Sequence, residues 1–153
     1  GDIPLTLAQT IPITGILVVT TPQDVASHVA VKAVSMFEKL NVPIIGVVEN
    51  MAHFICPNCD DKHYIFGEGG AKKISEQFNM PFLGEIPLNA GIMSGSDLGK
   101  PIMITNPDSP SAVAFRKSAK NIAAQCSIIA AKLQEEMASE SAEEESAPEP
   151  NTS

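Results

Sequence analysis

Two cysteines with the spacing Cys-x-x-Cys, Cys56 and Cys59, form the densest group of reactive side chains in the sequence. A pair at this spacing places two thiols on one tight loop, where they can share a soft metal or close a disulfide. His53 and His63 flank the pair, so four side chains are spaced to complete a tetrahedral zinc site. The motif by itself therefore predicts metal binding or redox chemistry and leaves the choice between them open.

Each of these interpretations has a plainer rival. The two histidines can be exposed on a polar loop beside Asp60, Asp61 and Lys62. A thioredoxin-like role needs the cysteines at a helix N-terminus, which lowers a thiol pKa, and no amphipathic helix begins at Cys59. The third cysteine, Cys126, lies in the apolar stripe of a predicted helix, where a thiol behaves as a small buried hydrophobe. We therefore favour a metal or cluster at the paired cysteines, with structural zinc as one form of it.

The segments that precede the cysteine loop predict a parallel sheet. Residues 15–20 and 44–49 are continuous apolar runs rich in β-branched side chains, which is typical of strands buried on both faces. Between them, a helical spacing of apolar residues begins after Asp24, a predicted N-cap, and ends near Asn41. Ligands of open parallel sheets gather beyond the carboxyl ends of the strands. Glu49, Asn50 and the cysteine loop are therefore expected on the functional edge.

The remaining segments predict helices, one further strand and a tail. Gly67 to Gly70 lack the Lys-Ser/Thr of a Walker A loop, so we interpret them as the entry to a short helix. Before them, one or two turns of helix are expected ahead of Pro12. The other expected elements are a strand at 82–87, a loop at 89–101, a short edge strand at 101–105, a long helix from Ser109 to about Ala138, and a disordered acidic tail at 139–153.

Composition excludes several classes of function. The formal charge of -8 is uneven, since residues 135–153 hold seven of the 18 acidic groups and leave 11 acidic against 10 basic groups elsewhere. A nearly neutral body gives no footprint for nucleic acid. The sequence is 44% hydrophobic but has no apolar run near about 18 residues, so no membrane partner or span is expected. Three cysteines and no signal-peptide pattern predict a reducing, cytoplasmic setting.

A resemblance to a known family covers most of the chain. It rests on residues 18–26, 46–51, 56–59, 65–71 and 83–88, which occur in the family's order. These segments are similar to those of the Mrp/ApbC family, iron–sulfur carrier ATPases in the MinD/ParA-like branch of the P-loop NTPases. No single motif among them is specific, and their order along the chain is what makes the match specific.

The resemblance implies a cofactor, partners and site residues. Cys56 and Cys59 of two protomers would hold one 4Fe–4S cluster at a homodimer interface, and the cluster would pass to apo iron–sulfur proteins. Asn50 would be the amide that reads adenine at the strand end. Pro87 would line the same base pocket. No catalytic residue is carried over to this stretch.

The resemblance also implies that part of the family's domain is not in this sequence. The Walker A loop and its lysine are absent, and only Gly1-Asp2 matches the end of the segment that follows them in the family. ATP and magnesium are therefore expected in the intact protein, an ATPase, and the fragment is expected to be inactive.

Residues 1–138 are interpreted as the C-terminal part of a P-loop NTPase-like domain. We expect a partial doubly wound, mostly parallel sheet of three or four strands with flanking helices and an exposed sheet edge where the family's first strand is missing. Two functions remain as rivals to cluster carriage, a structural zinc-binding interaction module and a MinD/ParA-like positioning ATPase.

Overall fold

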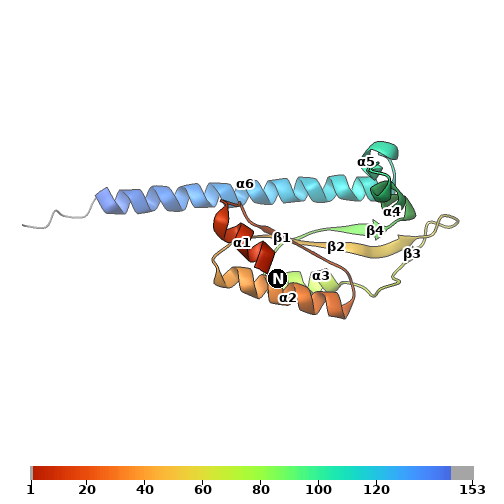
Figure 1. Ribbon diagram of the computed structural model, residues 1–153, viewed down its shortest axis with the longest axis horizontal. Coiled ribbons are helices and arrows are strands. Elements are labelled where there is room, and N and C mark those ends of the chain that lie inside the picture. Colours follow the sequence, from red (N-terminus) through yellow and green to blue (C-terminus); the bar gives the residue numbers. More distant parts are fainter. Residues whose placement is uncertain (1, 146–153) are drawn as a thin grey trace, which may run out of the picture.

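The sheet is organised around one long strand, β2 (Ile44–Ile55), in a computed structural model that describes residues 2–145 (Figure 1). Strands β1 (Ile16–Thr20) and β4 (Phe82–Leu88) pair with β2 in parallel, one on each side. The short strand β3 (Lys62–His63) runs antiparallel to the far end of β2. The predicted α/β class, with three or four mostly parallel strands, is confirmed.

Helices cover both faces of this sheet. Helices α2 (Asp24–Lys39) and α3 (Gly70–Gln77) lie on one face and α6 (Pro110–Glu145) lies on the other (Figure 1). The sheet residues Val18 and Val47 pack against α2 and α3 through Val34 and Ile74. On the opposite face, a second cluster packs against α6, and Cys126, predicted to be buried, is half-buried against it. Its buried members are Ile45, Val48, Leu83 and Ile86.

Gly84 sets the distance between β4 and α6. Its φ is 157°, which side chains rarely adopt, and a methyl group at this position would overlap Ser118 Oγ on α6. Close to this point, Asn121 Nδ2 donates a 2.9 Å hydrogen bond to the carbonyl oxygen of Leu83. A glycine is therefore required here because the helix approaches the strand so closely.

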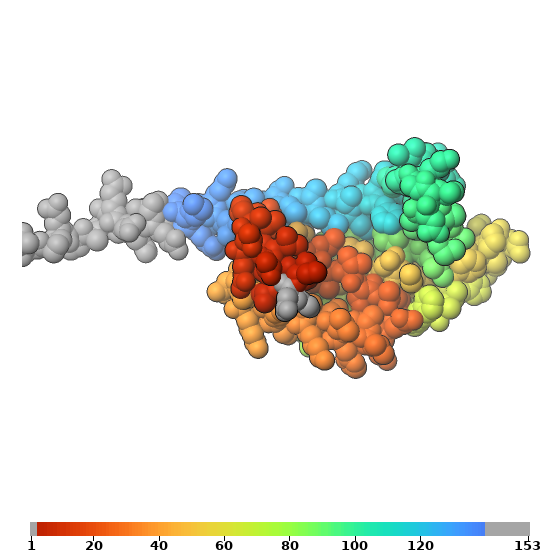
Figure 2. Space-filling view, viewed as in Figure 1, coloured from red at the N-terminus to blue at the C-terminus, as the bar shows by residue number. Residues whose placement is uncertain are grey.

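The β1 side of the sheet is open. Among the described residues no strand pairs with the outer side of β1, which confirms the expected exposed edge. The prediction that β1 is buried on both faces is wrong, because Val18 and Thr20 are buried but Val19 is 58% exposed. An apolar groove of about 560 Å³ runs along this strand, and α1 (Asp2–Thr10) contributes Pro4 to it. The space-filling view shows α1 on the near face of the molecule (Figure 2).

Three local predictions need correction. The expected loop at 89–101 contains helix α4 (Ala90–Asp97), capped by Asn89 Oδ1, which accepts a 2.7 Å hydrogen bond from the amide of Gly91. The expected edge strand is helix α5 (Ile102–Thr105), which packs against helices α4 and α6 and, among the described residues, pairs with no strand. Gln23 occupies the N-cap position of α2 without a capping hydrogen bond from its side chain, and the predicted cap, Asp24, lies in the first turn, where its negative charge is stabilised by the helix dipole.

The long helix α6 extends further than expected. It continues past Ala138 to Glu145, through a segment with four glutamates and one alanine, which are good helix formers. The rest of the expected disordered tail, 146–153, lies outside the described residues. Within the described part of the chain, no helix combines the length and the apolar composition needed to cross a membrane.

Candidate functional site

The cysteine loop projects from the end of β2 because the strand changes its register there. Asn50 faces Ile86 of β4, but Phe54 faces Leu88, so β2 bulges between these two positions. Met51 lies within the bulge with a φ of 56°. A bulge of this kind bends a strand away from its partner. β2 thus continues beyond the predicted end at Glu49 and carries the loop to the carboxyl edge of the sheet, where it forms a projection at one end of the molecule (Figure 2).

A short hairpin holds the backbone on both sides of the loop. Phe54 pairs with His63 and Ile55 with Lys62. The amide of Cys56 donates to the carbonyl of Asp61 at 2.9 Å, and the amide of Asp60 donates to the carbonyl of Cys56 at 2.9 Å. The loop backbone is therefore closed by hydrogen bonds while its side chains remain accessible.

Three potential ligands meet on this loop. The ligand atoms of Cys56, Cys59 and His63 all lie within 4.8 Å of one another. Cys56 is half-buried, and the other two residues are exposed. Cys59 Sγ also donates a 3.3 Å hydrogen bond to Asp61 Oδ2. The arrangement is an open site for a soft cation, reachable from solvent.

The loop favours the ionised form of one thiol. Backbone N–H groups of Asn58 and then Cys59 point at Cys56 Sγ and lower the pKa of Cys56 from its ordinary value, and the Cys59 thiol lowers it further when its single proton turns from Asp61 toward Cys56. Slight desolvation and the nearby charge of Asp60 oppose this change. Since the thiolate is the metal ligand and the nucleophile, Cys56 is predisposed to bind a metal.

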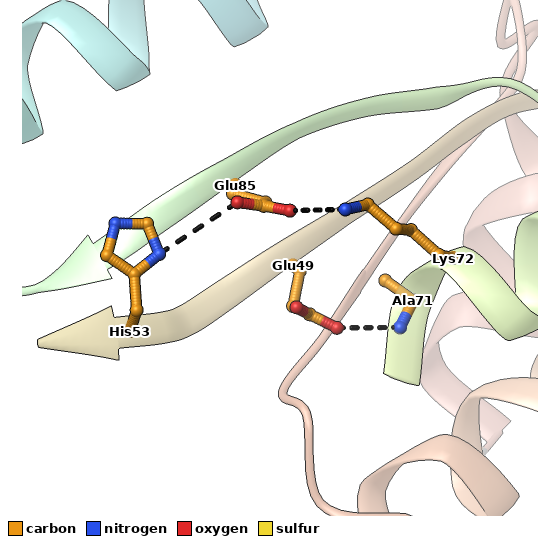
Figure 3. A network of polar contacts seen from close by, with 5 residues as sticks. All are labelled: Glu49, His53, Ala71, Lys72 and Glu85. Atoms are coloured by element: carbon orange, nitrogen blue, oxygen red, sulfur yellow. Dashed lines mark hydrogen bonds and ion pairs between the residues drawn. The ribbon is translucent and has the colours of Figure 1, made fainter. Parts of the chain in front are cut away.

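His53, predicted as a fourth zinc ligand, lies elsewhere. The residue is 5% exposed, and its ring packs edge-on against Tyr64 at 5.9 Å between ring centroids. Its Nδ1 lies 3.9 Å from Glu85 Oε2 (Figure 3). Burial is the main reason that the pKa of His53 is lowered; Lys62 lowers it further and Glu85 opposes the change. Within the described residues Nδ1 has no hydrogen-bond partner. The four-ligand zinc site is therefore not formed in this structure.

Glu49 acts as a buried cap, a role that the sequence reasoning missed. The residue is 2% exposed, and its Oε2 accepts a 2.7 Å hydrogen bond from the amide of Ala71 in the first turn of α3 (Figure 3). The positive end of the α3 helix dipole also stabilises the negative charge of Glu49. The Gly67 to Gly70 segment is the helix entry, as predicted, with Gly69 in the left-handed region at a φ of 72°. The position of Glu49 within an apolar strand sequence was the signal from which its buried role could have been predicted.

A charged pair lies one strand away from Glu49. Lys72 Nζ stands 3.1 Å from Glu85 Oε1, so Glu85 contacts both Lys72 and His53 (Figure 3). The hydrogen bond and charge of Glu85 raise the pKa of Lys72. The polar residues of β2 and β4 on this side thus link α3 to the base of the cysteine loop.

The two predicted nucleotide residues lie on neighbouring strands, where Asn50 pairs with Ile86 next to Pro87, and they line different cavities. Asn50 lines the groove beside β1 together with Thr20 and Thr21, and its Oδ1 accepts a 3.0 Å hydrogen bond from the amide of Met51. Pro87 lines two other cavities, of about 510 and 350 Å³, the smaller of which is also bounded by Cys56.

The parallel order of β1, β2 and β4, with helices on both faces and candidate ligands beyond their carboxyl ends, defines an open α/β domain of the nucleotide-binding type. A family model described as ParA, NUBPL iron-transfer P-loop NTPase, matches residues 1–123. The chain belongs to this family, and the resemblance to iron–sulfur carrier ATPases is confirmed.

Named relatives agree with this assignment. The iron-sulfur cluster transfer protein NUBPL of Dictyostelium discoideum is 46% identical over 129 residues, covering 84% of this chain and 40% of the relative. The iron-sulfur cluster carrier protein of Aquifex aeolicus is 49% identical over 120 residues, covering 78% of this chain and 33% of the relative. The chain therefore spans a third to two fifths of the length of these relatives.

A solved structure shares the fold. It is a nucleotide-binding protein from Archaeoglobus fulgidus in complex with ADP, in which cobalt was found. It superposes with a TM-score of 0.61 at 37% identity, over 75% of this chain and 46% of that one.

Proposed function

We propose that this chain forms the cluster-carrying part of an iron–sulfur carrier, in which Cys56 and Cys59 of two copies hold a bridging 4Fe–4S cluster for transfer to apo iron–sulfur proteins. The observation that carries the proposal is the accessible pair of thiols on a hydrogen-bonded loop beyond the carboxyl edge of the sheet. The relatives named as cluster carrier and cluster transfer proteins support the same chemistry.

The need for a second copy follows from the ligand count. Clusters of this type are held by four cysteine thiolates. The loop supplies two, and Cys126 packs against the apolar cluster beneath α6, so it is not available to the same cluster. Two copies meeting at their cysteine loops supply four thiolates and make the cluster a bridge between them.

We further propose that nucleotide controls this bridge in the intact protein. Asn50 at the strand end would read the adenine, Pro87 would contribute to the pocket, and ATP with magnesium would bind through parts that the relatives possess beyond the matched stretch. The stretch of β2 between Asn50 and Cys56 connects the two sites directly. Accessible free thiols favour a reducing compartment such as the cytoplasm.

Anaerobic reconstitution with iron and sulfide tests the proposal. The wild-type chain should take up about four iron and four sulfide per pair of chains, with the broad charge-transfer absorption of a 4Fe–4S cluster. It should then activate an apo acceptor that binds such a cluster through four cysteines. Cys56→Ser and Cys59→Ser should each abolish uptake, whereas Cys126→Ser is the matched control and should retain it.

Two results would contradict cluster carriage. One is a cluster that survives in the Cys56→Ser, Cys59→Ser double variant, since the cargo would then be held elsewhere. The other is tight zinc at one ion per chain that resists replacement by iron and sulfide and leaves no cluster, which would favour a structural zinc module.

A further inference from the structure

We propose that a single copy of this chain also binds one mononuclear divalent cation of the zinc or cobalt class through Cys56, Cys59 and His63. This site goes beyond cluster carriage, because it needs one chain instead of two and uses a histidine that the cluster does not. It shares only the two sulfur atoms with the proposed cluster site.

The distances on the loop suit such an ion. In a tetrahedral site with metal–sulfur bonds of about 2.3 Å and metal–nitrogen bonds of about 2.1 Å, the ligand atoms stand roughly 3.5 to 3.8 Å apart. The three atoms here lie within 4.8 Å of one another without an ion, so contraction by about an ångström completes the geometry.

The loop is able to make that contraction. The side chains of Cys59 and His63 are exposed, and within the described residues the imidazole of His63 has no hydrogen-bond or ion-pair partner to lose. Its backbone position is fixed by pairing of His63 with Phe54. Rotation about side-chain bonds is therefore sufficient, and the hairpin backbone does not need to move.

The ligand set defines the type of ion. Two thiolates and one imidazole favour zinc and cobalt over magnesium and calcium, which prefer oxygen. Asp61 lies beside Cys59 but is not among the three mutually close ligands, so the fourth position stays open to water. Binding displaces the two thiol protons to solvent and changes no oxidation state.

One consequence is competition between the two forms of the site. A mononuclear ion occupies both sulfurs of the loop. The ion must therefore be released, with loss of its bonds to Cys56, Cys59 and His63, before the thiolates of two copies can share a cluster. His63 therefore favours the one-chain form and protects the thiols while no cluster is present.

Anaerobic titration of the reduced chain with Co²⁺ tests the site. We expect one Co²⁺ per chain, sulfur-to-cobalt charge transfer together with the strong d–d bands of four-coordination, and sedimentation as a single copy. His63→Ala should weaken Co²⁺ binding by about tenfold or more and shift the d–d bands, since even a lost supporting contact costs about that much. His28→Ala is the matched control, because His28 is exposed on α2 and should change nothing.

A rescue variant guards against a trivial loss of folding. His63→Cys should restore tight binding and add sulfur-to-cobalt charge transfer, which a merely unfolded His63→Ala would not explain. The proposal is overturned if Co²⁺ binds at one ion per two chains with a spectrum and affinity that His63→Ala leaves unchanged. Cluster reconstitution in His63→Ala separates the two ideas, since the four-thiolate cluster should still form, and its failure in the wild-type chain would count against cluster carriage alone.

Discussion

The two halves of β2 differ in how they are held. The first half, up to Asn50, pairs with β1 on one side and β4 on the other, and Val47 within it is fully buried. The second half loses its register with β4, contains Met51 at a φ of 56° and 39% exposure, and ends in the loop with the thiols. We call residues 44–50 of β2 the fixed half and residues 51–55 the adaptable half.

This difference explains where chemistry is possible on the chain. Polar groups of the fixed half, such as Glu49, are already satisfied by protein partners and are committed to the fold. The ligand atoms on the loop that follows the adaptable half have hydrogen-bond partners only within that loop, and two of the three residues are exposed, so they can turn toward a metal. The structure therefore separates the stability of the sheet from the geometry of the site.

A substitution in β4, the strand that pairs with the fixed half of β2, should have the largest effect on the free energy of unfolding. Gly84→Ala places a methyl group on Ser118 Oγ, and overpacking of this kind should lower the free energy of unfolding by about 2 to 3 kcal/mol. The measurement is urea-induced unfolding followed by circular dichroism. A loss below about 0.5 kcal/mol would show that α6 moves away easily, and would contradict the close packing described above.

A second variant tests the cause of that loss. Within the described residues Ser118 Oγ is buried without a hydrogen-bond partner, so Ser118→Ala alone should be close to neutral. In the double variant it should recover about 1 kcal/mol of the Gly84→Ala loss, because the overlapping oxygen is gone. Independent, additive effects would contradict the proposed contact.

Removing the buried carboxylate should have the next largest effect. Glu49→Ala leaves the amide of Ala71 without its acceptor and removes a negative charge from the start of α3, which should cost about 2 kcal/mol. Glu49→Gln keeps an acceptor oxygen and should cost less. Urea unfolding measures both, and Glu76→Ala, an exposed glutamate on the same helix, is the control. Equal values for Glu49→Ala and Glu76→Ala would show that the cap contributes nothing.

His53 should give the fold a dependence on pH. Because burial lowers the pKa of His53 below the ordinary 6.5, the unfolded chain binds more protons than the folded chain in the range between the two values. The contribution of neutral His53 to the free energy of unfolding is complete above pH 6.5 and is lost as the pH falls through the lowered pKa. The free energy of unfolding changes over this range by less than about 1.4 kcal/mol per pH unit.

The measurement compares variants along a pH series. Unfolding midpoints of His53→Gln should fall less between pH 7.5 and 5.5 than those of the wild type. His28→Gln, which changes an exposed histidine on α2, should follow the wild type. A steeper fall in His53→Gln than in the wild type would contradict a lowered pKa of His53 in the folded chain.

Much of the scaffold was predictable from local patterns. The apolar runs of β1, β2 and β4 and the helical spacing of α2 and α6 reflect burial, which leaves a periodic trace in the sequence. Helix α4 was missed because Gly91, Gly95 and Gly99 suggested a loop. In the structure, a side chain at Gly95 would meet the carbonyl of Lys100, and Gly99 ends the helix at a φ of 64°, so these glycines serve close approach and termination.

The polar contacts of the site were only partly predictable. The spacing of Cys56, Cys59 and His63 is local, and it correctly placed these residues together. His53 is equally close in sequence, yet its partner Glu85 comes from β4, and Glu49 bonds to an amide 22 residues away. Such contacts depend on how strands and helices pack, which a single sequence does not encode in a short motif.

The smallest effect is expected at the thiols themselves. In the metal-free chain, Cys56→Ser and Cys59→Ser together should change the free energy of unfolding by less than about 0.5 kcal/mol, because the hydrogen bonds that close the hairpin come from the backbone. Urea unfolding in the presence of a chelator measures this, with Glu49→Ala as the reference for a large loss. A loss above about 1 kcal/mol would show that the thiols hold the fold together, so the two halves of β2 would not be independent. If the small value is found, all the ligand-dependent stability of this chain must arise when a metal or cluster draws the loop together.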